Sequence, residues 1–302
     1  MFAQLRGNNQ GVVKLTGGGM AKAENCKEAR LEKETESSAL IDGGQTHGML
    51  VLRKGVDICI EKAKKNGIAT VGTFNTSTST GCLGYFAHRI AREGLVAILC
   101  STSPPKVAPH GSSQPLFGTN PLCIGFPATE EEGAVVLDFT TAAIAYYGLL
   151  EAKLADKNIP EGIAYNVEGK LTTDPSQVLE GGAIKSFDGS HKGSGLALMV
   201  ALLPGPLVKA SFAGIDTTNW GNFVIAISPS LFLQDVHTFR QQVSHLLQKV
   251  RSARKTGKEE VMTPGERGNR VYNEAIKSGH VQIDKGLYEA LLKAAQQKNS
   301  KL

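Results

Sequence analysis

Three short segments of the sequence combine charged or hydroxyl side chains with the expected start of a helix. Residues 138–141 place an acid and two threonines after an apolar run, and residues 191–195 place Lys192 beside two glycines before an apolar stretch. Residues 264–267 join a proline and a glycine to an acid and a base. The first N–H groups of a helix lack partners within it, so helix starts bind anions such as phosphate. The sequence therefore predicts three surfaces for an anionic ligand or cofactor.

Each segment also has a purely structural interpretation. Thr140 and Thr141 are of a residue type that caps a helix N-terminus without any ligand. Gly193 and Gly195 permit close packing of a helix as readily as close approach of a ligand. These residues alone leave both alternatives open.

The common nucleotide and hydrolase motifs are absent from the sequence. No Gly-x-Gly-x-x-Gly follows an expected strand, and neither a P-loop nor a Gly-x-Ser-x-Gly turn occurs. The spacing of the five cysteines matches no metal motif. We therefore expect free thiols and no metal site, and a nucleotide, if one binds, would be held by a design other than the Rossmann type.

The composition excludes several classes of partner. The chain of 302 residues is 41% hydrophobic, and no apolar run is long enough to span a membrane. Its net charge of +5 comes from 33 basic residues mixed with 28 acidic ones, without a basic stripe for nucleic acid. The densest basic segment, residues 249–258, has the pattern of a solvated helix end. We expect a cytoplasmic protein with no nucleic-acid or membrane partner.

The chain alternates strand and helix patterns from residue 46 onward. Strands are expected at 68–74, 95–101, 122–126, 134–139 and 222–228. Helices are expected at 50–65, 84–92, 141–153, 193–203, 234–253 and 284–298. The long loop 102–121 is of a length that is usually functional or disordered. The first 45 residues show no sustained hydrophobic period and resemble an incomplete or poorly packed N-terminal segment. The fold class is α/β.

Six motifs then occur in an order and spacing that resemble the malate/L-lactate dehydrogenase family, which includes ureidoglycolate and sulfolactate dehydrogenases. The similarity runs from about residue 39 to residue 292. The motifs are Gly118-Thr119-Asn120-Pro121, Val136-Leu137-Asp138-Phe139-Thr140, Ile159-Pro160-Glu161-Gly162, Thr172-Thr173-Asp174-Pro175, Lys192-Gly193-Ser194-Gly195-Leu196-Ala197-Leu198 and Pro264-Gly265-Glu266-Arg267.

The resemblance implies a homodimer with a central mixed β-sheet flanked by helices, and a non-Rossmann NAD(P)-binding fold. It also implies a helical lobe from both chain ends. The expected divisions are 1–75 for the first part of that lobe, 76–230 for the cofactor domain and 231–302 for the returning helices. The family's contacts with NAD or NADP fall on Ser103, Asp138, Phe139, Thr140, Lys192, Gly193, Gly265, Glu266 and Arg267.

Two histidines that the family implies for proton transfer have no evident counterpart. Ser79 occupies the place of one of them, and a hydroxyl does not titrate near neutral pH. The other belongs to an upstream Ser-His-Gly segment that the chain is expected to lack, as an N-terminally shortened member. Thr46-His47-Gly48 is similar but precedes a different helix. His110, in the long loop, is the remaining candidate for a catalytic histidine.

The resemblance thus implies an NAD(P)-dependent oxidoreductase that interconverts a 2-hydroxy acid and a 2-oxo acid. The alternative is an impaired or inactive member that binds nucleotide and dimerises. The preserved cofactor segments favour the enzyme, whereas the missing histidines favour the alternative.

Overall fold

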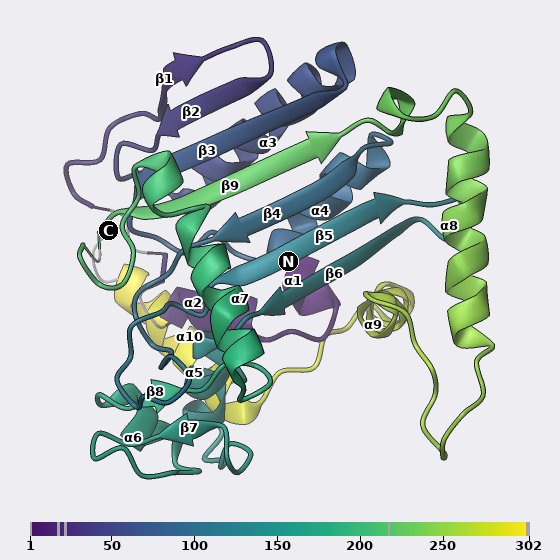
Figure 1. The fold of residues 1–302 in the computed structure, drawn as a ribbon. Helices are drawn as coiled ribbons and strands as arrows, with labels where there is room; N and C mark the ends of the chain where they lie inside the picture. Colours follow the sequence, from purple (N-terminus) through teal and green to yellow (C-terminus); the bar gives the residue numbers. More distant parts are fainter. Residues whose placement is uncertain (1, 17–18, 21–22, 217, 300–302) are drawn as a thin grey trace.

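The computed structural model describes residues 2–16, 19–20, 23–216 and 218–299 (Figure 1). A seven-stranded sheet with the order β1-β2-β3-β9-β4-β5-β6 lies at its centre. Strands β2 and β3 are parallel and the other neighbours are antiparallel, so the sheet is mixed as expected. The strands are β1 (Arg30–Glu34), β2 (Ser38–Asp42), β3 (Ile68–Thr76), β4 (Val96–Ser101), β5 (Pro121–Pro127), β6 (Ala134–Thr140) and β9 (Trp220–Ile227).

Two helices cover one face of this sheet and form the main core with it. Figure 1 shows α3 (Gly48–Asn66) and α4 (Leu83–Arg92) behind the sheet. Val56 of α3 and Ile90 of α4 are fully buried among strand residues such as Leu99 and Val224. Helix α3 ends at Gly67, whose φ of 84° favours glycine.

A smaller unit holds the middle of the chain. It contains α5 (Tyr146–Leu154), α6 (Pro175–Leu179) and the pair β7 (Ala164–Tyr165) and β8 (Ala183–Ile184). Its core includes Val107, Leu149, Ile159 and Ile184, each at most 4% exposed.

The two ends of the chain pack together. Helices α1 (Phe2–Leu5) and α2 (Gln10–Thr16) contact α9 (Glu266–Ser278) and α10 (Lys285–Asn299), respectively. Arg6 Nη2 donates to Gly265 O at 2.9 Å. The expected lobe from both ends is therefore confirmed. The expectation of a poorly packed N-terminal segment is wrong, because Val13 is fully buried by contacts with residues distant in sequence.

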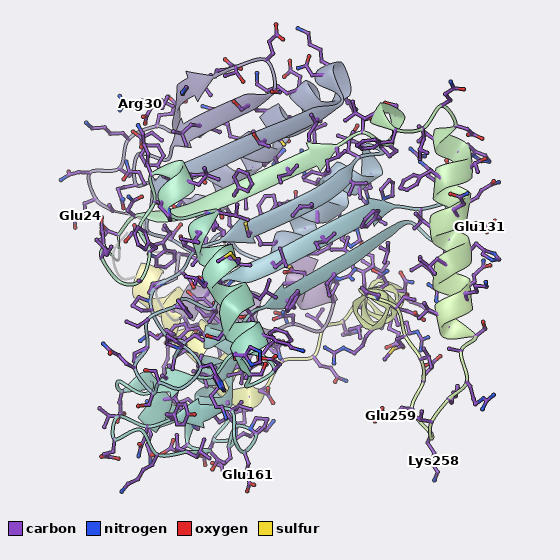
Figure 2. All side chains as sticks on the ribbon, in the orientation of Figure 1. Glu24, Arg30, Glu131, Glu161, Lys258 and Glu259 are labelled. Carbon is purple, nitrogen blue, oxygen red and sulfur yellow. The ribbon has the colours of Figure 1, made fainter. Side chains whose placement is uncertain are left out.

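Most expected elements appear within a few residues of their predicted bounds, including α7 (His191–Leu202) and α8 (Val236–Arg251). The short turns η1 (Pro206–Val208) and η2 (Pro229–Leu231) were not predicted. The basic segment after α8 is exposed, and Figure 2 shows Lys258 and Glu259 at the tip of a loop that points away from the body. Strands β1 to β3 join the same sheet as the strands of residues 76–230. The proposed divisions 1–75, 76–230 and 231–302 stay predictions.

Candidate active site

A cavity of about 910 Å³ opens where β6 ends. Segments distant in sequence line it: α1, α2, the start of α3, the loop before α4, residues 101–106, the end of β6 and the start of α5. Among the predicted site residues, the cavity brings together Ser79, Ser103, Asp138, Phe139 and Thr140. Its size lies within the range of small-molecule and cofactor pockets.

Asp138 connects β6 to the first turn of α4. Its Oδ2 accepts hydrogen bonds from Gly84 N at 2.7 Å and from Cys82 Sγ at 3.1 Å. Protein surrounds the carboxyl, although its side chain still meets the solvent of the cavity. This enclosure raises the pKa of Asp138, while the two donors and the charges of Lys14 and Arg6 act in the opposite direction. Asp138 therefore serves as a helix cap that also faces the cavity.

The hydroxyl groups at the end of β6 hold the neighbouring loop in place. Thr140 Oγ1 donates to Thr119 O at 2.5 Å and accepts from Ala142 N at 3.1 Å. Ser103 Oγ accepts from Thr119 N at 2.9 Å. The sequence predicted a helix start at Thr141, which is wrong, because the buried Thr141 Oγ1 donates to Asn120 O at 2.9 Å and α5 begins only at Tyr146.

Lys192 and Gly193 lie at a true helix start outside the lining of this cavity. Helix α7 is capped by Ser190, whose Oγ accepts from Lys192 N at 3.1 Å. Gly193 N donates to Asp188 Oδ2 at 3.2 Å, so an acid already occupies part of this anion-binding position. The segment stays close to the cavity through Phe187, whose ring lies 5.7 Å from that of Phe139.

The third predicted surface, at the start of α9, also lies outside the cavity lining. Glu266 Oε2 accepts from both Thr263 N and Thr263 Oγ1 at 3.0 Å, and from Arg251 Nε at 3.0 Å. These donors, led by the Thr263 N–H, lower the pKa of Glu266 to about 2. Gly265 lies against β6, and the Arg267 side chain is exposed. Their cofactor role stays a prediction.

Ser79 and His110, the two residues considered for proton transfer, lie in different places. Ser79 is buried at the cavity wall, where its N–H donates to Gly19 O at 2.9 Å and its Oγ accepts from Gly81 N at 3.2 Å. His110 lines a separate pocket of about 200 Å³, with its Nδ1 3.2 Å from Gly189 O. The structure does not bring His110 to the main cavity, and its catalytic role stays a prediction.

Several cavity residues had not been identified from the sequence. Lys14, Arg53 and Lys106 bring positive charge, and the aromatic rings come from Phe2, Tyr85, Phe86, Tyr146, Tyr147 and Trp220. Lys14 Nζ lies 4.8 Å from the centroid of the Tyr147 ring, and Lys106 Nζ lies 5.5 Å from that of Tyr146. A weak signal existed in the adjacent tyrosines, but nothing in the pattern of residues 1–45 distinguished Lys14.

The cavity has the chemistry to hold a nicotinamide cofactor and a small acid. Aromatic faces accept flat rings by stacking, hydroxyls accept ribose, and the cations attract phosphate or carboxylate. In the part of the chain that the structure describes, no group of three or more His, Cys, Asp or Glu side chains is arranged to hold a metal ion. None of the described helices is long and apolar enough to cross a membrane.

Comparisons with known proteins agree with this arrangement. A family model for malate/L-lactate dehydrogenase matches residues 9–292. The malate/(S)-sulfolactate dehydrogenase of Methanothermus fervidus is 39% identical, over 90% of this chain and 79% of the relative. The malate dehydrogenase of Pyrococcus horikoshii is 32% identical, over 83% and 72%. The solved sulfolactate dehydrogenase of Methanocaldococcus jannaschii has a TM-score of 0.78 at 30% identity, covering 98% of this chain and 87% of that one.

The fold and the comparisons define an oxidoreductase of hydroxy acids and oxo acids that uses a nicotinamide cofactor. The chain belongs to the malate/L-lactate dehydrogenase family. The family resemblance inferred from the motifs is confirmed. The match to the family model begins at residue 9 and includes α2, whereas the motifs had indicated the similarity only from about residue 39.

Proposed function

We propose that this protein uses NADH or NADPH to reduce small 2-oxo acids that carry a second anionic group, of the oxaloacetate type. The observation that carries this proposal is the charge of the cavity. Among the described residues, three cationic side chains, Lys14, Arg53 and Lys106, line it together with a single acid, Asp138. Such an excess of positive charge favours a dianionic substrate beside an anionic cofactor. The names of the relatives, malate and sulfolactate dehydrogenases, support the same substrate class.

The proposed cofactor contacts divide into two groups. Ser103, Asp138, Phe139 and Thr140 form a continuous wall of the cavity and are proposed to contact the nicotinamide half. Lys192, Gly193, Gly265, Glu266 and Arg267 are proposed to contact more distant parts of the dinucleotide. In this second group, the Glu266 carboxylate already accepts hydrogen bonds from Arg251 and Thr263.

The proposal is tested by following oxidation of NADH and NADPH with oxaloacetate, sulfopyruvate and pyruvate. We expect KM for the two dianions to be at least about tenfold below that for pyruvate, which corresponds to about 1.4 kcal/mol. Arg53→Met should remove most of this difference while NADH binding, measured by fluorescence, is retained. Lys65→Met, on the exposed end of α3, is the matched control for loss of one positive charge. Turnover of none of the three acids would contradict the proposal.

A second candidate function is nucleotide binding without efficient turnover. It is favoured by one specific observation: the position that the family resemblance assigns to a histidine is a buried serine, and His110 lines another pocket. Saturable NADH binding without oxidation of the cofactor by any oxo acid would support this candidate over the first.

We also propose that the protein is a homodimer and that it works in the cytoplasm. The face of the sheet opposite α3 and α4 supports the dimer. On β9, Val224 and Ala226 are fully buried, while Phe223 and Ile225, which point to the other face, are only half-buried. Helix α7 lies in front of this face (Figure 1) and exposes Leu198, Met199 and Leu202 by 41%, 52% and 40%. Apolar surface of this kind favours association.

A further inference from the structure

The proposed reduction needs a proton donor inside the cavity. Hydride addition to the oxo carbon leaves a pair of electrons on the oxygen, and an acid must neutralise that charge. Neither Ser79 nor His110 is suited to the task, since the first is a hydroxyl and the second lies in a different pocket. The cavity itself must therefore be searched for a side chain that releases a proton.

Most polar groups of the cavity are unsuited as donors. The guanidinium of Arg53 stays protonated, because arginine does not deprotonate in proteins. The Cys82 thiol already donates to Asp138, and burial raises its pKa to about 12. Burial also raises the pKa of Tyr147, which makes the phenol a weaker acid. Among the nitrogen groups of the cavity, the ammonium groups of Lys14 and Lys106 are the ones able to release a proton.

We propose that Lys14 donates the proton to the substrate's oxo oxygen during reduction. This inference rests on the proposed function. Among the described residues, nothing forms a hydrogen bond or an ion pair with the Lys14 ammonium; it faces the Tyr147 ring at 4.8 Å and lines the cavity. Its N–H groups are thus available to a ligand. Lys106 is assigned, together with Arg53, to binding the substrate's second anionic group.

The surroundings of Lys14 favour release of its proton. Burial lowers its pKa, and electrostatic interactions with Cys82 and Asp138 oppose this shift only in part. Helix α2 packs against α5 and α10. Several described titratable groups lie on these two helices or on the turn after α1. They are Arg6, Tyr146, Tyr147, Glu151, Lys153, Lys285, Tyr288, Glu289 and Lys293. None of their acids forms an ion pair with Lys14.

The proposed step balances as follows. Hydride from the reduced cofactor forms a C–H bond at the oxo carbon, and the π bond of the carbonyl breaks toward oxygen. An N–H bond of Lys14 breaks, its proton forms the new hydroxyl, and its electron pair stays on nitrogen. The substrate is reduced, the cofactor is oxidised, and the neutral amine regains a proton from solvent after product leaves.

The central test compares Lys14→Arg with Lys14→Met. Arginine keeps the positive charge but does not release a proton, so Lys14→Arg should lower kcat for oxaloacetate reduction by at least about 100-fold with little change in KM. Lys14→Met should lower kcat similarly and also raise KM. NADH binding by fluorescence and the circular dichroism of both variants should match the unmodified protein, and Lys65→Arg, on the exposed end of α3, should retain its kcat.

Two further readouts separate acid catalysis from a structural role. An acid must be protonated to act, so kcat for reduction should be constant below the pKa of Lys14 and fall above it, and Lys14→Arg should lack this fall. Reductive methylation with 13C-labelled formaldehyde gives each lysine an NMR signal. The signal missing from Lys14→Arg should titrate at lower pH than those of the exposed lysines.

Three results would overturn the inference: full kcat in Lys14→Arg, loss of kcat in Lys106→Arg alone, or titration of the Lys14 signal together with the surface lysines. If the unmodified protein oxidises no cofactor with any 2-oxo acid, the proposed function fails and the inference fails with it. Turnover by the unmodified protein together with an equally active Lys14→Arg would reject the inference alone.

Discussion

At the scale of single residues, Asp138 links stability to pH through an unusual environment for a carboxyl. Its folded-state pKa is raised, so between the ordinary aspartate value of about 3.9 and that raised value the folded chain binds more protons than the unfolded one. The free energy of unfolding should therefore fall as pH rises through this window.

Replacement of Asp138 by asparagine should abolish that contribution. Asp138→Asn keeps an oxygen that accepts from Gly84 N, and it removes the charge. The stability of this variant relative to the unmodified protein should therefore increase as pH rises. Urea unfolding at several pH values between 4 and 7 measures this difference. Asp138→Ala, which also removes the cap, should be about 1 kcal/mol less stable than Asp138→Asn at every pH. Parallel profiles for Asp138→Asn and the unmodified protein would contradict the assigned environment.

His88 has the opposite dependence on pH. Burial and the nearby charges of Arg6 and Arg92 lower its pKa to about 4, and its Nε2 is buried without a hydrogen-bond partner among the described residues. The unfolded chain therefore takes up this proton first as pH falls below about 6.5, so stability is lost between pH 6.5 and 4. His88→Phe, whose ring can pack on Phe2, should unfold at higher temperature than the unmodified protein at pH 5 and at a similar temperature at pH 7.5. Equal melting temperatures at pH 5 would refute the prediction.

The cavity residues illustrate what sequence patterns reveal of a site. Asp138, Phe139 and Thr140 were predictable because they belong to a motif at the end of a short apolar strand. Lys14 was not, because α2 has only seven residues and its position depends on contacts with α5 and α10. A helix of two turns is stabilised by its tertiary neighbours rather than by a local pattern.

At the scale of elements, Glu266 joins three segments. It binds Arg251 at the end of α8, Arg270 on α9, and Thr263 before α9, while Arg251 also forms a bidentate ion pair with Glu132 of the β5–β6 turn at 2.7 and 2.8 Å. The depressed pKa of Glu266 means that this stabilisation is present above about pH 4.5 and is lost as pH falls toward 2.

Glu266→Gln should therefore destabilise the protein by about 1–3 kcal/mol at pH 7, the range for a hydrogen bond to a charged group. The difference in stability between Glu266→Gln and the unmodified protein should shrink below pH 4. Calorimetric melting at both pH values measures the effect, and Glu289→Gln on exposed α10 serves as the control. If Glu266→Gln instead weakens NADH binding at unchanged stability, the residue's proposed cofactor contact outweighs its role in the network.

Helix boundaries were predicted less well where side chains make tertiary hydrogen bonds. Residues 141–145 have a helical pattern in sequence, yet Thr141 N and Oγ1 bond to Thr119 O and Asn120 O, and the helix begins only at Tyr146. Helix α4 and strand β4, by contrast, were placed within one residue at each end because their apolar periods are uninterrupted.

At the scale of the whole molecule, the proposed dimer is open to a direct test. Leu202→Lys on α7 places a charge within the exposed apolar face and should weaken association by at least about tenfold, or about 1.4 kcal/mol. Sedimentation velocity over a range of concentrations measures the dissociation constant. Leu171→Lys, at a leucine of 60% exposure in a separate unit, should leave it unchanged. A monomer at all concentrations before any substitution would contradict the proposal.

The order of the sheet was the part of the fold least accessible from sequence. The α/β class and most of the main elements followed from periodicity, but nothing in the sequence indicated that β9 lies between β3 and β4. Strand pairing is decided by which edges the whole chain brings together, and this information is not local.

The position of β9 has a consequence for synthesis of the protein on the ribosome. Thr76 of β3 pairs with Trp220 of β9, 144 residues later, and β4 pairs with β9 as well. At ordinary rates of translation the nascent chain waits on the order of 10 s between the emergence of β3 and that of its partner. During this interval the edges of β3 and β4 that pair with β9 have no permanent neighbour, and unpaired edges promote aggregation. Nascent chains stalled before residue 220 should therefore remain sensitive to protease and dependent on chaperones, and chains stalled well beyond residue 227 should become resistant.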